Sequence, residues 1–210
     1  WAPIVYGAAE HERWEVLART SAVLLTVGSL VGGCVALLAP VALDLVAPAS
    51  YRVDDLTSVT AVLAVAIVPM LLYQSHVQVL FQRGRTGTLG WASPLAAVVN
   101  IVLTIVLVAR WGLIGAAVAT VASYCVQAVV IRAAARRLET VPWRPRTAAQ
   151  AWAAAGALAL AGWALPTSAP GVAVRLAIAA AAGVVCVAVV RRSLRPAPLP
   201  AAPVSGMVGA

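Results

Sequence analysis

The chain has 210 residues, of which 62% are hydrophobic and 10% are charged, and its mean hydropathy is +0.95. This balance is far more apolar than that of a soluble globular domain, which excludes an ordinary water-soluble enzyme or binding module. The net charge of +8 comes from arginines that fall between apolar segments rather than in one basic cluster, so it does not indicate nucleic acid binding.

Uncharged segments long enough to cross a membrane recur along the whole chain. A helix needs about 20 apolar residues to span a hydrocarbon core of about 30 Å. Six segments qualify: Thr20 to Leu43, Leu56 to Leu80, Leu89 to Ala109, Gly112 to Ile131, Ala148 to Leu165, and Val172 to Val190. Only Arg175 lies inside one of them, near its end, where we expect the long side chain to extend to the membrane interface. The pattern predicts an all-α polytopic transmembrane bundle with six spans.

The arginines between these segments are distributed unequally. All 15 basic residues are arginine, and sorting them among the loops between the six segments places 12 of them on one side. The other side holds Arg52, Arg110 and Arg175. Because cytoplasmic loops carry the positive excess, we predict a multi-pass protein of the cytoplasmic membrane with both ends of the chain in the cytoplasm.

The spans divide the chain into five parts. Residues 1–19 form a cytoplasmic or interfacial segment, in which Glu10 to Arg19 is amphipathic and predicts either a short interfacial helix or an extension of the first span. Residues 20–131 hold four spans, 132–147 form a basic loop, and 148–190 hold two more spans. Residues 191–210 are rich in proline, and we expect them to be disordered. Because the chain begins with Trp1 and has no signal peptide, we expect it to be a piece of a longer protein.

Polar side chains inside the spans are the candidates for a substrate path, because polar groups in hydrocarbon need partners in the bundle or in a hydrated cavity. The second span places Gln74 and Gln78 on one face and His76 nearby, whereas Asn100 lies in the third span and Gln127 in the fourth. Two interpretations remain open. These residues line a cavity, or they form hydrogen bonds between helices.

Small residues at helical spacing begin the fourth span. Gly112, Gly115, Ala116 and Ala119 predict a ridge that lets another helix approach closely. Pro69 and Pro94 fall inside the second and third spans, where a lost backbone hydrogen bond allows a kink or hinge.

The sequence offers no candidate catalytic residue, metal-ligand cluster or cofactor motif. The three cysteines lie in apolar segments and are odd in number, which is typical of small buried side chains. We therefore expect a protein that is not an enzyme and that uses no metal or cofactor.

Two stretches resemble a known family. The segment from Asn100 to Leu103, and then Trp111-Gly-Leu-Ile-Gly-Ala-Ala continuing to Tyr124, is similar to the C-terminal lobe of polysaccharide-biosynthesis flippases, which belong to the multidrug, oligosaccharidyl-lipid and polysaccharide exporter superfamily. The inner turn from Gln82 to Thr86 looks similar too. The resemblance covers about residues 2–138, and it departs at Ala109-Arg110, where the family often has a proline.

The resemblance implies a role for the chain. The first four spans of this chain would correspond to the ninth to twelfth spans of the family. The last two would correspond to the extra pair of helices found in its fourteen-helix members. The implied partners are membrane lipid, a lipid-linked glycan substrate, and the missing N-terminal part of the same chain, with no nucleic acid. The implied mechanism is alternating access. Two alternatives remain: a cation-coupled drug or metabolite exporter of the same superfamily, and a membrane scaffold that transports nothing.

Overall fold

The computed structural model of the chain describes residues 7, 9–10, 12–46, 48 and 53–193. Within these residues every regular element is a helix. The helices are α2 (Arg13–Val46), α3 (Val53–Val65), α4 (Ile67–Gln82), α5 (Gly87–Trp111), α6 (Leu113–Arg136), α7 (Pro145–Ala164) and α8 (Ala169–Ser193). The predicted all-α bundle is confirmed.

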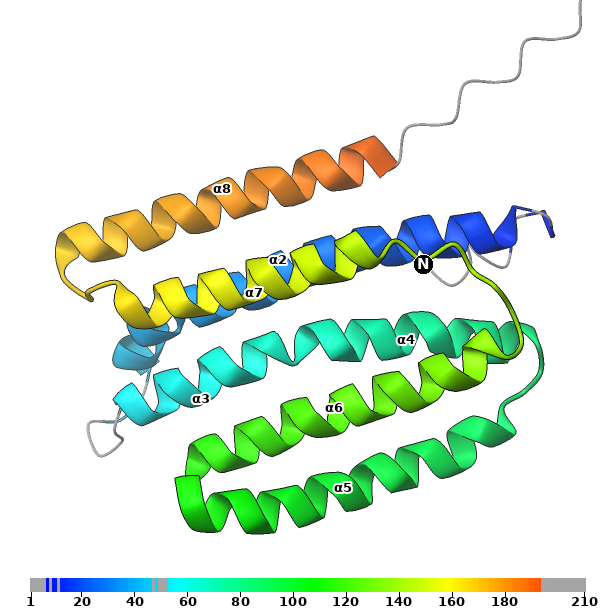
Figure 1. The fold of residues 1–210 in the computed structure, drawn as a ribbon. Coiled ribbons are helices and arrows are strands. Elements are labelled where there is room, and N and C mark those ends of the chain that lie inside the picture. Colours follow the sequence, from blue (N-terminus) through cyan, green and yellow to red (C-terminus); the bar gives the residue numbers. More distant parts are fainter. Residues whose placement is uncertain (1–6, 8, 11, 47, 49–52, 194–210) are drawn as a thin grey trace, which may run out of the picture.

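The helices pass up and down the bundle in turn, with α3 and α4 in line as two halves of one pass (Figure 1). Consequently α2 begins and α8 ends at the same end, where the Arg19 guanidinium donates to the backbone oxygen of Ser193 over 3.4 Å. We call this the arginine end, because the starts of α2 and α7 and the ends of α4, α6 and α8 carry most of the described arginines there. Its placement in the cytoplasm stays a prediction.

Five passes are long and apolar enough to cross a membrane: α2, Asp55–Gln82, α5, α6 and α8. The sixth predicted span is α7, which has 20 residues but is alanine-rich and less apolar than the other five. It packs along α2, and its buried face consists of Ala151, Ala155, Ala159 and Gly162. Small side chains bring it close to its neighbour, so its place in the bundle depends more on packing than on hydropathy.

Helix α2 is 34 residues long, which corresponds to about 51 Å and exceeds a hydrocarbon core of about 30 Å. From Arg13 onward, the predicted amphipathic segment is therefore the extension of the first span rather than a separate interfacial helix. Its fully buried Leu17 joins Val77, Leu80 and Ile131 in the main apolar cluster at the arginine end. Most of the predicted disordered tail, residues 194–210, lies outside the described residues.

Glycine determines two close helix approaches. A Cβ atom on Gly115 would lie 2.3 Å from the backbone oxygen of Leu107, so α5 and α6 touch backbone to backbone as the small-residue ridge predicts. Ala119 is fully buried in the same ridge. A Cβ atom on Gly162 would lie 2.5 Å from the backbone oxygen of Ala36, which fixes α7 against α2 in the same way.

Gly112 differs from the rest of the predicted ridge. It ends α5 with φ at 59° and ψ at −140°, and a Cβ atom there would meet nothing within 4 Å. Because side chains disfavour positive φ, Gly112 is required by the tight turn between α5 and α6 and not by helix packing.

Arg175 does not extend to the interface as the sequence predicts. It is 1% exposed and donates to the backbone oxygens of Leu37 in α2 and Leu165 after α7. The guanidinium points into the bundle because these carbonyl groups offer acceptors, and the end of α7 leaves the oxygen of Leu165 free to accept.

Candidate functional site

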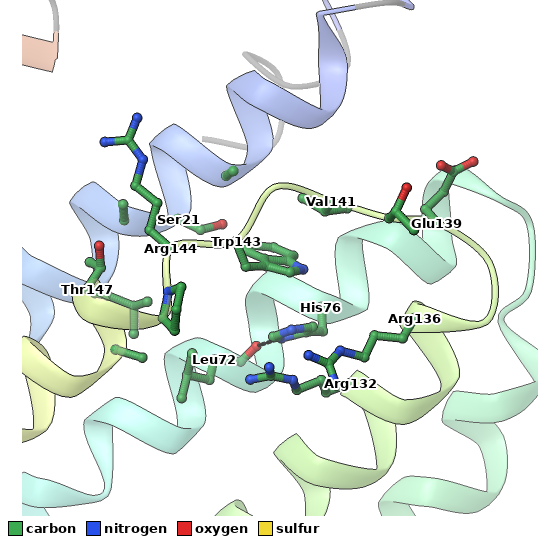
Figure 2. Close-up of a pocket in the computed structure, with 16 residues that line it drawn as sticks. Ser21, Leu72, His76, Arg132, Arg136, Glu139, Val141, Trp143, Arg144 and Thr147 are labelled. Carbon is green, nitrogen blue, oxygen red and sulfur yellow. Dashed lines mark hydrogen bonds between the residues drawn. The ribbon is translucent and has the colours of Figure 1, made fainter.

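A pocket with charged and polar side chains on its wall is sunk into the arginine end between α2, α4, α6, α7 and the segment that joins α6 to α7 (Figure 2). We call it the arginine pocket, and its volume is about 370 Å³. It is lined by Ala18, Ser21, Ala22, Leu25, Leu72, His76, Arg132, Arg136, Glu139, Thr140, Val141, Trp143, Arg144, Pro145, Thr147 and Ala148. Four helices that are distant in sequence therefore supply one site.

His76 forms part of the floor of this pocket and is 2% exposed. Its Nδ1 lies 2.6 Å from the backbone oxygen of Leu72. Because a carbonyl oxygen only accepts, Nδ1 carries the hydrogen, and the neutral ring then keeps Nε2 as an acceptor. The Trp143 ring lies over the imidazole with 4.6 Å between centroids. This stack holds the ring in place.

Two buried polar atoms on the lining have no hydrogen-bond partner within the described part of the chain. They are Nε2 of His76 and Oγ of Ser21, whose residue is 1% exposed. Buried polar atoms are nearly always paired, so an unpaired atom on the wall of a pocket indicates a bound water, ion or ligand group.

The charge of the pocket is strongly positive. Figure 2 shows the guanidinium groups of Arg132 and Arg136 side by side near the imidazole of His76. These two arginines are spaced i,i+4 on α6, an arrangement that is repulsive for like charges. Among the described residues that line the pocket, Glu139 is the only carboxylate, and it already forms a salt bridge with Arg83. The lining therefore repels cations and attracts an anion.

The predicted polar residues do not gather in this pocket. Of the five, only His76 lines it, whereas Gln74 is exposed and Gln78 is half-buried on another face of α4. Asn100 donates to Oγ of Ser123 over 3.1 Å, and Gln127 donates to Oγ of Ser93 over 3.4 Å. Asn100 and Gln127 thus connect α5 to α6, as the hydrogen-bonding interpretation predicts for them.

No pattern in the sequence, apart from the run of arginines around Trp143, points to the pocket's other main residues. Arg132, Arg136 and Arg144 served only to orient the chain, because a sequence does not tell which loop arginines face one another. The segment between α6 and α7 folds back so that Trp143 reaches His76, 67 positions earlier. The run of arginines around a single tryptophan was the only available signal.

Replacing Ser123 with alanine tests the link between α5 and α6. We expect a loss of about 0.6 kcal/mol in the free energy of unfolding, because hydrogen bonds between membrane helices are worth about that much. SDS-induced unfolding in mixed micelles, followed by circular dichroism, measures it. In a double-mutant cycle with Asn100→Ala the losses should not add, and the exposed Gln74→Ala serves as control. Additive losses would show that Asn100 acts elsewhere.

Within the described ranges no three His, Cys, Asp or Glu side chains are placed to hold a metal ion. The three cysteines are free and partly buried. Comparison of the chain with protein-family models, with curated protein sequences and with solved structures finds no match.

Proposed function

We propose that residues 1–210 are the C-terminal part of a flippase that moves a lipid-linked oligosaccharide across the cytoplasmic membrane by alternating access. Several apolar helices make the chain a membrane protein and are compatible with a transporter. The finer proposal rests on the resemblance of the segment from Asn100 to Tyr124 and on the geometry described next.

The observation that most supports transport is a one-residue interruption of the regular hydrogen bonding in the middle of one membrane pass, at Ala66, whose backbone dihedrals stay helical. Helix α3 ends at Val65 and α4 begins at Ile67, and between them the Ala66 N–H donates to Leu63, three residues back, over 3.0 Å. Pro69 follows and has no N–H to donate to the oxygen of Val65. A pass weakened at this depth provides a hinge, a feature that many transporters build from discontinuous helices.

The half of the pass beyond this break forms a wall of the arginine pocket, through Leu72 and His76. Two glycines of α2 face the hinge: a Cβ atom on Gly28 would lie 2.3 Å from Leu71, and one on Gly32 would lie 3.1 Å from the oxygen of Ala64. These close approaches pack α2 directly against the residues on both sides of the hinge. Movement at the hinge would therefore change the shape of the pocket.

The bundle also offers an apolar groove of about 640 Å³ between α2 and α8, lined by residues that include Val31, Leu38 and Ala182. An apolar groove of this kind suits the hydrocarbon tail of a lipid-linked substrate. A cation-coupled drug exporter would not need a groove for such a tail.

The test is a flipping assay in proteoliposomes that contain the complete protein to which this chain belongs. We expect a fluorescent polyprenyl-diphosphate oligosaccharide to cross the bilayer and a fluorescent phosphatidylcholine not to cross. Pro69→Ala restores the missing N–H and should slow the crossing about tenfold, equivalent to about 1.4 kcal/mol in the barrier. Pro94→Ala, in the exposed part of α5, is the matched control.

Three outcomes would contradict the proposal. Equal crossing of both lipids would indicate a non-selective scramblase, and uptake of a small cationic drug driven by an ion gradient would favour the exporter. Crossing supported by residues 1–210 alone would show that no further part of the protein is needed.

A further inference from the structure

We infer that the arginine pocket binds the headgroup of an anionic phospholipid of the phosphatidylglycerol type, drawn from the membrane leaflet at the arginine end. This lipid is a resident partner and not the transported molecule. The inference holds for any membrane function of the chain, because it depends only on the charge, depth and unpaired polar atoms of the pocket.

The charges of the pocket require an anion. Arg132 and Arg136 lie side by side, and the salt bridge between Glu139 and Arg83 uses up the only carboxylate on the lining (Figure 2). Helix α7, which has 20 residues, starts at Pro145 on the same wall with no side-chain cap, so the positive end of its dipole adds to the field. A phosphate between the two guanidinium groups removes their repulsion and accepts hydrogen bonds from both.

The depth of the pocket matches a lipid headgroup. Its wall on α2 runs from Ala18 to Leu25, which corresponds to about 10 Å along the helix. Each polar layer of a bilayer is about 5 to 7 Å thick, and the first predicted span begins at Thr20, so the pocket would reach from the polar layer into the adjoining part of the hydrocarbon core. The phosphate group of a phospholipid lies at this level, so the headgroup can enter the pocket while the acyl chains of the lipid stay in the membrane.

The unpaired atoms favour a headgroup with hydroxyl groups. His76 Nε2 accepts and the Ser21 hydroxyl both donates and accepts, so each atom suits a hydroxyl group of a headgroup. A choline or ethanolamine headgroup would bring a cation to a wall that already holds Arg132 and Arg136. A volume of about 370 Å³ is enough for one phosphoglycerol group.

The test measures lipid retention by the full chain in nanodiscs of equal parts dioleoyl phosphatidylglycerol and dioleoyl phosphatidylcholine, by native mass spectrometry after release into detergent. We expect one phosphatidylglycerol to be retained in preference to phosphatidylcholine. The double variant Arg132→Gln with Arg136→Gln should weaken retention at least about tenfold. Arg137→Gln with Arg146→Gln removes the same charge at the same end from residues that do not line the pocket, and should change retention less than about twofold.

Two milder variants keep the test decisive if the double variant unfolds. Ser21→Ala should weaken the retention of phosphatidylglycerol several-fold, because the hydrogen bond from the Ser21 hydroxyl is lost. Glu139→Gln removes the only lining carboxylate and should strengthen retention.

Three results would overturn the inference. Retention of both lipids alike would show that the pocket does not select charge. If the control variant of Arg137 and Arg146 weakened retention equally, the effect would come from the total charge of this end and not from the pocket. If excess inorganic phosphate or glycerol phosphate displaced the lipid, the natural ligand of the pocket would be a soluble anion and not a lipid.

Discussion

Replacing Arg175 with alanine should lower the free energy of unfolding by about 3 kcal/mol, the largest single effect we expect in this chain. The side chain is 1% exposed and connects α8 to the backbone oxygens of Leu37 and Leu165. Its removal opens a cavity and leaves the backbone oxygens of Leu37 and Leu165 without these donors. SDS-induced unfolding in mixed micelles measures the loss.

Two further variants separate the cavity from the hydrogen bonds of Arg175. Arg175→Met keeps most of the volume and loses the donors, so it should cost less than alanine, about 1 to 2 kcal/mol. Arg110→Ala removes an exposed arginine at the same end of the bundle and should change stability by less than about 0.5 kcal/mol. A loss with Arg110→Ala as large as that with Arg175→Ala would mean that net charge, and not the buried contact, stabilises this end.

Replacing Gly115 with alanine should lower the free energy of unfolding by about 2 kcal/mol. The new Cβ atom would lie 2.3 Å from the backbone oxygen of Leu107 and 2.4 Å from its carbonyl carbon, so α5 and α6 would have to move apart. Backbone atoms cannot turn aside as a flexible side chain can. The shift would also stretch the nearby hydrogen bond between Asn100 and Ser123.

The same substitution at Gly156 in α7 is the matched control, because a Cβ atom there would meet nothing within 4 Å. Alanine favours a helix over glycine by about 0.5 to 1 kcal/mol, so Gly156→Ala should stabilise the chain by a similar amount. Opposite signs for the two substitutions in the same unfolding assay are the expected result. Equal signs would show that the approach of α5 to α6 is looser than the structure has it.

Several features of this fold could be predicted because they follow from local chemistry. A segment such as 89–109, apolar and uncharged over a membrane thickness, must satisfy its backbone by forming a helix. The distribution of the arginines fixed an even number of passes, which places the start of α2 beside the end of α8. The small-residue ridge at Gly115 was also visible, because close helix approach needs small side chains at helical spacing.

The candidate site was less predictable, because its residues come from positions with no common pattern. Of the polar residues on the second span, His76 lines the pocket, whereas Gln74 and Gln78 lie on another face of α4. The spacing of polar residues on one helix does not say which face the next helix covers. Asn100 and Gln127 face α6 and α5, respectively, because these two helices form a hairpin with a tight turn at Gly112.

The sequence by itself determined the membrane-spanning helices, their number of passes and the side on which the arginines gather, since hydropathy and charge act on each segment separately. Only the tertiary structure decided that Trp143 stacks on His76, that Arg132 and Arg136 share one pocket, and that Arg175 turns inward. The physical reason is that these contacts join residues distant in the chain, and their free energy depends on which helix faces pack together, which no single segment specifies.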